Sequence, residues 1–446
     1  MPTKPVSRRD FVGTSAAAAG AFTIVPRHVL GGPGFIAPSD KLNVACIGVG
    51  GMGRNDVDGM SGENIYALCD VDWKAAEDAF RTFPKAKRFK DYRELFDKEA
   101  AKIDLVTVST PDHSHAPASM LSLQAGKPTY TQKPLARTLY EVRTLGEEAR
   151  KRKLPTQMGN QGHAGDGMRV LREMVEADLI GTVREVHYWT NRPIWPQGLD
   201  RPTELHAPPS TLDWNLWLGP RPDRPYNPAY MPFKWRGWWD FGTGALGDMA
   251  CHGMDAAFWI LDLGFPDRII PESTTLYTES APRSERIEYQ FGARGNRGPI
   301  TVVWRDGDLR PPRPAGYPDD ADWPFADIGG QLWIGDKGGI LAGIYAENPR
   351  LLDQKKQKEL EASPLPQKYP RSKGVYAEII DAAKGGPPAL SNFDGHAGAL
   401  TQMVLLGCLA VRAGKTLELD SKTGMITNVK LPEEWVKPAF RDGWRV

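Results

Sequence analysis

The residues with the clearest chemical potential are Asp248 and His252, four positions apart at the start of a helix-like segment expected to run on to residue 260. This spacing places both side chains on one face of a helix, so that the carboxylate can orient the imidazole while the ring takes a proton. Histidine is the side chain suited to accepting a hydroxyl proton near neutral pH. The alternative is a histidine that is simply hydrogen-bonded in the core. The pair predicts an acid–base site.

Lys133 lies between Gln132 and Pro134, directly after a short predicted strand at residues 128–131. A lysine at that end of a strand can hydrogen-bond a substrate oxygen and hold positive charge where an alkoxide develops. The alternative is a solvated surface charge, which the flanking strand and proline disfavour. We therefore expect Lys133, Asp248 and His252 to be the catalytic residues.

A glycine-rich turn follows the first apolar strand, at residues 42–47, and precedes a helix-like segment. In a dinucleotide-binding βαβ unit, the first glycine permits the tight turn, the second lets the pyrophosphate approach the backbone, and the third lets the helix pack closely. The strand, the helix and an acid about 20 residues further on are the context that this motif needs. The residues expected to bind the dinucleotide are Gly48, Gly50, Gly51, Met52, Gly53 and Asp70.

Asp70 ends the second strand, at residues 65–69, and favours NAD over NADP. A carboxylate there accepts hydrogen bonds from the ribose hydroxyls and repels a 2′-phosphate. Arg54 or Lys74 would weaken this inference if either reached such a phosphate.

Further cofactor contacts are expected after the strand at residues 104–109, because ligands lie at the carboxyl ends of strands in such sheets. His113 and His115 also have the spacing of a metal pair, but no third ligand is identifiable nearby, and a packing or capping role suits His115 better. We therefore expect no metal site. The further residues expected at the cofactor are Thr110, Pro111, His115, Gln132 and Lys133.

The 446-residue chain is 41% hydrophobic with a net charge of +1, which indicates a two-domain globular protein and disfavours a nucleic-acid partner. Strands alternate with helices up to about residue 158, which predicts an α/β, doubly wound parallel sheet at residues 41–158. Longer β-rich segments follow and predict an α+β domain with a large, open, mostly antiparallel sheet at residues 159–446. Its C-terminal helices could pack back on the first domain.

Residues 1–35 are predicted to be a leader. Arg8 and Arg9 form a twin-arginine signature, and a mild apolar run follows at residues 12–25. That run is too short and weakly apolar to be a stable anchor, so no membrane span is expected in the mature protein. We expect export to the periplasm by the twin-arginine pathway, which carries folded proteins; a chance arginine pair is the alternative.

In their order and spacing, these motifs resemble the glucose-fructose oxidoreductase / inositol dehydrogenase (Gfo/Idh/MocA) family over the whole chain after the leader. The glycine-rich turn with Asp70 matches its nucleotide fingerprint, and Asp248-x-x-x-His252 matches its second catalytic motif. Gln132-Lys133-Pro134 matches its Glu-Lys-Pro motif, with glutamine where glutamate is more common. The resemblance implies a Rossmann domain, an open-faced sheet used for substrate and often for oligomer contacts, and a Lys, Asp and His trio at the nicotinamide. A homo-oligomer is therefore expected.

Half of the 14 tryptophans lie between residues 189 and 239. Flat rings offer apolar faces to sugar C–H groups while polar neighbours bond the hydroxyls. The alternative, that the rings pack loops onto the sheet, holds for several of them. The segment at residues 159–163 also resembles exported branches of the family. The residues expected to bind substrate are Gln161, His163, Trp195, Arg236 and Trp238.

These residues predict an NAD(P)-dependent oxidoreductase that transfers hydride between the cofactor and a hydroxyl of a sugar, glycoside or cyclitol. One alternative keeps the same residues but adds elimination: transient oxidation acidifies a ring C–H, the aglycone leaves, and re-reduction regenerates NAD, as in an NAD-recycling glycoside hydrolase. A second alternative is a non-catalytic, nucleotide-dependent sensor, which the intact set of Lys133, Asp248 and His252 disfavours.

Overall fold

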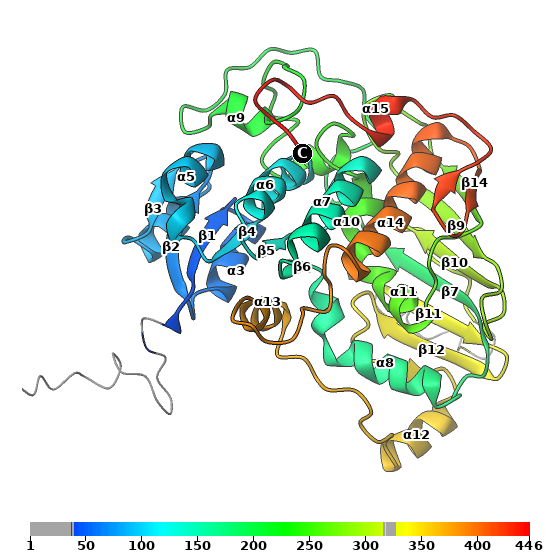
Figure 1. Ribbon diagram of the computed structural model, residues 1–446. Helices are drawn as coiled ribbons and strands as arrows, with labels where there is room; N and C mark the ends of the chain where they lie inside the picture. Colours follow the sequence, from blue (N-terminus) through cyan, green and yellow to red (C-terminus); the bar gives the residue numbers. More distant parts are fainter. Residues whose placement is uncertain (1–36, 38–39, 315–316, 318–326) are drawn as a thin grey trace, which may run out of the picture.

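The computed structural model describes residue 37, residues 40–314, residue 317 and residues 327–446. The expected leader at residues 1–35 lies outside the described residues. Two β-sheets dominate the described chain, one built from its first third and one from the remainder (Figure 1).

The first sheet is fully parallel, with strand order β3-β2-β1-β4-β5-β6. This is the strand order of a Rossmann sheet, in which ligands bind at the carboxyl ends where the order reverses, between β1 and β4. The strands are β1 (Asn43–Ile47), β2 (Asn64–Cys69), β3 (Lys87–Phe89), β4 (Leu105–Val108), β5 (Thr129–Thr131) and β6 (Thr156–Met158).

Helices connect these strands, and their ends follow local sequence signals. Thr138 and Glu141 form a reciprocal capping box at the start of α7, and Asp91 caps α5 by accepting a hydrogen bond from the amide of Arg93. The helices are α3 (Met52–Gly59), α4 (Glu77–Thr82), α5 (Tyr92–Glu99), α6 (Asp112–Gln124) and α7 (Leu139–Arg152).

The second sheet has nine strands in the order β13-β12-β11-β7-β10-β9-β8-β14-β15. All its pairs are antiparallel except β7 with β10. Both sheets therefore confirm the predicted fold class. The strands are β7 (Val183–Thr190), β8 (Arg268–Ser273), β9 (Glu285–Phe291), β10 (Ile300–Arg305), β11 (Gly329–Gly335), β12 (Gly338–Gly343), β13 (Arg350–Leu351), β14 (Leu417–Asp420) and β15 (Met425–Ile426).

Helices α7, α10 and α14 lie between the two sheets (Figure 1). Leu145 of α7, Leu246 of α10 and Leu406 of α14 share one core with Val302 of β10. The helices of this part are α8 (Asp166–Glu176), α9 (Trp214–Leu218), α10 (Gly244–Gly253), α11 (Asp255–Ile260), α12 (Gln354–Ala362), α13 (Val375–Ala383), α14 (His396–Ala413) and α15 (Glu433–Val436).

Helix α14 is long and apolar enough to cross a membrane, but 72% of it is buried inside the protein. A helix that is apolar on all sides is also what a core position between two layers requires. Its packing against α7 and α10 accounts for its composition.

The helix predicted from residue 248 to residue 260 is two helices. Met254 ends α10 and precedes α11, so Asp255 begins a new helix. Asp255 therefore does not belong to the helix that carries Asp248 and His252. The apolar spacing of the sequence did not indicate this break.

Two late segments return to the first domain. Val375 and Ile379 of α13 share a core with Val44 of β1. Trp444 packs its edge against Tyr92, with ring centroids 5.8 Å apart, and lies in the same core as Ile47.

Candidate active site

The glycine-rich turn has the close approaches that a dinucleotide site requires. A Cβ at Gly53 would lie 2.1 Å from the carbonyl oxygen of Gly48, so only glycine lets α3 start this near β1. Gly48 adopts φ +77°, and a Cβ there would lie 2.7 Å from the backbone of Ser109. No side chain caps the first turn of α3 and no acidic residue lies in it, so no carboxylate there opposes a phosphate. The amides of Gly53 and Arg54 donate to the carbonyl oxygens of Gly50 (3.0 Å) and Gly51 (3.2 Å).

Asp70 lies beside this turn. Its Oδ2 accepts hydrogen bonds from the amides of Val49 (2.9 Å) and Gly50 (3.2 Å), and its Oδ1 accepts one from Asp72 (2.9 Å). Burial raises the pKa of this carboxyl, while these backbone donors lower it. Asp70 is therefore placed at the turn, as its position after β2 predicts.

The two basic residues considered for a 2′-phosphate both have carboxylate partners. Arg54 donates from Nε to Asp78 (2.8 Å) and also pairs with Asp58. Lys74 pairs with Glu77, with Nζ and Oε2 2.5 Å apart. Both cations are thus already paired with carboxylates, and the residues at the turn fit NAD.

Lys133 and Asp248 come together at the mouth of the first sheet. The Lys133 ammonium donates to Oδ1 of Asp248 (2.8 Å) and to its backbone oxygen (2.9 Å). Arg236 donates from Nε to the same Oδ1 (3.1 Å). Burial would raise the pKa of Asp248, but the charges of Lys133 and Arg236 hold it well below its usual range.

His252 is close to this group but is not oriented by Asp248 as the helix spacing predicts. No hydrogen bond joins the two residues in the described chain, because two cations from outside the helix hold the carboxylate. Nδ1 of His252 is buried without a hydrogen-bond partner, and the ring faces Tyr345, with centroids 4.8 Å apart. Burial and the charge of Lys133 lower the pKa of His252 to about 3, so the imidazole is neutral near pH 7.

Gln132 does not face Lys133. Its Nε2 donates to both oxygens of Asp56 (2.9 Å each), a buried residue of α3 that also accepts from Ser109 (2.6 Å) and Tyr376 (2.8 Å). Burial raises the pKa of Asp56, while these donors lower it. The neutral amide of Gln132, next to Lys133, thus hydrogen-bonds a buried carboxylate. The sequence carried no signal for this pairing, because the partners are 76 residues apart.

The histidines of α6 connect loops. Nδ1 of His115 lies 2.8 Å from the carbonyl oxygen of Pro134, and its Nε2 lies 2.8 Å from that of Thr110. His115 therefore joins the two loops predicted to face the nicotinamide. His113 also lies between two backbone carbonyl oxygens, those of Phe241 and Trp217. Neither ring leaves a nitrogen for the metal pair that their spacing suggested.

Asp112 is a further acid that sequence reasoning did not assign. It is buried at the start of α6 and accepts a hydrogen bond from Oγ1 of Thr243 (2.9 Å). Burial raises its pKa to about 7; the charge of Arg236 opposes this and that of Asp248 adds to it. A carboxyl that titrates near neutrality thus lies beside the Lys133 group. Its place directly after Pro111, at a strand end, was the available signal.

Only some of the residues predicted to bind substrate lie near Asp248. The Arg236 guanidinium packs on Phe233 (4.2 Å to the ring centroid) and lies 5.8 Å from the Trp195 ring, so these residues gather beside Asp248. Gln161 is half-buried on the turn after β6. Trp238 differs from the prediction: it is fully buried, and its indole donates to the carbonyl of Ala229 (3.0 Å).

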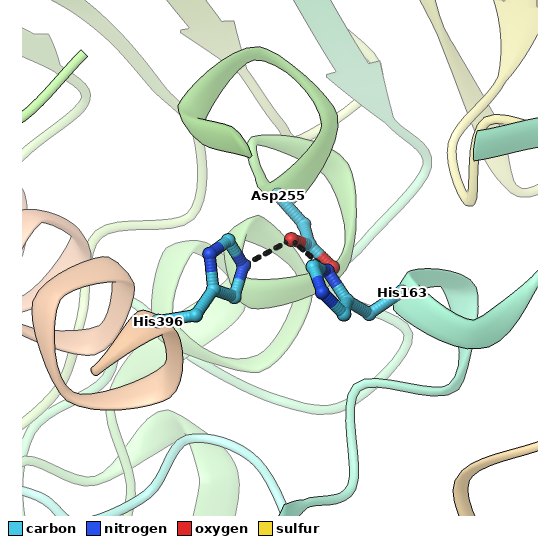
Figure 2. Close-up of side chains that lie close together, drawn as sticks. All are labelled: His163, Asp255 and His396. Atoms are coloured by element: carbon cyan, nitrogen blue, oxygen red, sulfur yellow. Dashed lines mark hydrogen bonds and ion pairs between the residues drawn. The ribbon is translucent and has the colours of Figure 1, made fainter. Parts of the chain in front are cut away.

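His163 also lies away from an open surface. It is 1% exposed, and its Nδ1 lies 2.9 Å from Oδ1 of Asp255 (Figure 2). Nε2 of His396 lies 2.6 Å from the same oxygen. Burial would raise the pKa of Asp255, but His163 and His396 hold it well below its usual range. Sequence reasoning identified His163 alone, because Asp255 lies 92 residues further along the chain and His396 another 141 residues beyond Asp255.

Two family models match the chain. The model GFO_IDH_MocA, described as an oxidoreductase family with an NAD-binding Rossmann fold, matches residues 42–160. The model of the C-terminal alpha/beta domain of the same oxidoreductase family matches residues 169–296.

Relatives are similar over part of their length. A glycosyl hydrolase family 109 protein of Shewanella pealeana is 30% identical over 203 residues, 40% of this chain and 44% of the relative. An inositol 2-dehydrogenase/D-chiro-inositol 3-dehydrogenase of Lacticaseibacillus casei is 33% identical over 146 residues, 31% of this chain and 42% of the relative. The chain thus matches less than half the length of these curated relatives.

Solved structures share the fold. The WlbA dehydrogenase from Bordetella pertussis, in complex with NADH and UDP-GlcNAcA, superimposes with a TM-score of 0.58 at 15% identity. The likeness covers 85% of this chain and 99% of that one.

Proposed function

Since this chain belongs to the Gfo/Idh/MocA oxidoreductase family, with an NAD-binding Rossmann domain, we propose that it oxidises or reduces a hydroxyl-bearing carbon of a sugar, glycoside or cyclitol. The observation that carries the proposal is the convergence of Lys133 and Asp248 at the mouth of the Rossmann sheet, with a neutral His252 nearby. These residues come from segments 115 positions apart.

When bound, NAD supplies the carbon that exchanges hydride with the substrate. His252 takes the proton of the substrate hydroxyl, for which a neutral imidazole is required. Lys133 donates to the same oxygen and stabilises its negative charge during the transfer. Asp248 holds the Lys133 ammonium in place, and Arg236 and Trp195 contact the rest of the substrate.

Replacing either group tests this assignment. Lys133→Met and His252→Asn should each abolish turnover while NAD binding, followed by titration calorimetry, persists. The matched control is Lys127→Met, a lysine just before β5, at the opposite end of the strand that precedes Lys133. Full turnover in both catalytic variants, with hydride transfer followed as NADH absorbance, would falsify the assignment.

An NAD-recycling glycoside hydrolase is the second candidate, favoured by the similarity to the glycosyl hydrolase family 109 protein. The two candidates differ in cofactor balance. A dehydrogenase forms one NADH for each substrate oxidised, whereas a recycling hydrolase releases aglycone with no net NADH. Measuring aglycone and NADH in the same reaction separates them.

We also propose a homo-oligomer, supported by the family's use of its open sheet for subunit contacts. Light scattering coupled to gel filtration tests this: a mass of one chain, 49.3 kDa, would contradict it.

A further inference from the structure

The cluster of His163, Asp255 and His396 lies outside the Lys133 group and has no role in the proposed reaction. Its side chains come from the turn after β6, the start of α11 and the start of α14, and they point toward one another (Figure 2). One ligand-type atom from each lies within 4.8 Å of the other two. Among the described residues, this is the group of three that has such a spacing.

Two imidazole nitrogens and one carboxylate oxygen form a donor set typical of zinc and neighbouring transition metals. Both nitrogens approach the same oxygen, Oδ1 of Asp255, at 2.9 and 2.6 Å. Two ligands that each lie about 2.0–2.1 Å from a tetrahedral ion are about 3.3 Å apart. To admit an ion, the two nitrogen–oxygen distances would lengthen by about 0.4 Å and about 0.7 Å, and the two nitrogens would take a similar spacing.

The carboxylate of Asp255 is oriented by hydrogen bonds on the side away from the histidines, as the carboxylate ligands of metal sites are. Asn160 donates from Nδ2 to Oδ2 of Asp255 (2.8 Å), which leaves Oδ1 facing the imidazoles. Ser391 in turn donates to the side-chain oxygen of Asn160 (2.7 Å). These bonds fix the orientation of the carboxylate without using the oxygen that faces the histidines.

The three side chains of the cluster are also shielded from solvent. The side chains of His163 and Asp255 are 1% and 0% exposed, and that of His396 is 11% exposed. A carboxylate buried this deeply requires a compensating positive charge. Arg169, six residues after His163, donates to the backbone oxygen of His163 rather than to the carboxylate.

We propose that His163, Asp255 and His396 bind one divalent transition-metal ion of the zinc class. The ion joins three segments that are far apart in the chain. Asp255 follows His252 by three residues across the break at Met254, so the ion fixes the end of the helix that carries the catalytic base. Its burial makes it a structural ion that has no contact with substrate.

The first test is the metal content of the purified full-length chain by mass spectrometry, after dialysis against zinc and then against metal-free buffer. We expect about one equivalent per chain. His163→Gln and His396→Gln should each reduce this at least tenfold. The matched control is His187→Gln, because His187 lies 3.0 Å from the Glu185 carboxylate without a second histidine. This variant should keep the ion.

The second test needs no substitution, in case the variants do not fold. After EDTA treatment, wild-type protein should gain thermal stability on adding zinc, and cobalt should give the visible absorption bands of a site with nitrogen ligands. Metal-free wild-type protein with no response to either ion would overturn the proposal and leave a purely hydrogen-bonded cluster. Equal metal content in wild type and both cluster variants would also overturn it.

Discussion

Asp248 contacts Lys133 and Arg236 through one carboxylate oxygen, which makes it a positioning residue for the lysine. Asp248→Asn keeps the shape of the side chain but removes the charge that holds the ammonium. We expect kcat to fall by about 10²-fold, the size of losing one transition-state contact. NAD affinity should change little, because Asp70 and the glycine-rich turn are untouched.

A double-mutant cycle separates this role from orientation of His252. If Asp248 acts through Lys133, adding Asp248→Asn to Lys133→Met should cause no further loss of the residual rate, measured in single turnovers. Adding it to His252→Asn should multiply the two losses. The reverse pattern would return Asp248 to the role that its helix spacing suggested.

Asp112 predicts a pH dependence of stability. Its pKa in the folded protein is about 7 and that of an unfolded aspartate is about 3.9. Because the folded value is the higher one, the contribution of the protonated carboxyl is complete below the unfolded pKa. It is lost as the pH rises through about 7. Asp112→Asn should therefore flatten the fall of Tm between about pH 4 and pH 7.

Calorimetry at several pH values measures this flattening. Asp306, a second buried carboxyl whose pKa is raised to about 7, is present in both proteins and supplies a common background. Parallel Tm curves for wild type and variant would show that Asp112 does not titrate in this range.

At the scale of elements, Asp56 connects α3 to the loop after β5 through Gln132 and to α13 through Tyr376. Gln132→Glu introduces the residue that the family more often has, but here it brings a second carboxylate to hydrogen-bond distance of the first. We expect a loss of about 1–3 kcal/mol in unfolding free energy near pH 8. The loss should shrink at lower pH, as one carboxyl takes a proton.

Urea unfolding at two pH values measures this loss. Adding Asp56→Asn to Gln132→Glu restores one amide and one carboxylate in exchanged positions, so most of the stability should return. A Gln132→Glu variant as stable as wild type at both pH values would show that the two side chains do not meet.

The sequence predicts elements well where the signal is local. The turn at residues 48–53, the strands on either side and Asp70 obey short-range rules of backbone geometry, and the parallel sheet follows from alternating strands and helices. The similarity to family motifs also predicted that Lys133 and Asp248 lie in one site.

Partners chosen across long separations were not predictable from one sequence. The helix face shared by Asp248 and His252 is real, but the pattern could not show that Lys133 and Arg236 would hold the carboxylate. The pairing of Asp56 with Gln132 and the meeting of His163 with His396 depend on tertiary packing. Trp238 shows the same limit, since a tryptophan that binds a sugar and one that fills a core have the same composition signal.

At the scale of the whole molecule, we propose that residues 1–35 direct export through the twin-arginine pathway. Replacing both Arg8 and Arg9 by lysine in the full chain should retain the protein in the cytoplasmic fraction of a Gram-negative host, while the wild type reaches the periplasm. Arg27→Lys, outside the motif, is the matched control. Immunoblots of the two fractions measure the distribution, and an unchanged distribution would contradict the proposal.

Trp444 lies in the core of the first domain, against Tyr92 and beneath the Arg93 guanidinium, 4.1 Å from its ring centroid. During translation, the nucleotide-binding domain therefore lacks part of its own interior until nearly 300 further residues have been made. Domains that are contiguous in sequence can finish folding in the order of their synthesis. Here part of the core of the first domain is supplied by Trp444, so that core is complete only after this residue has been made.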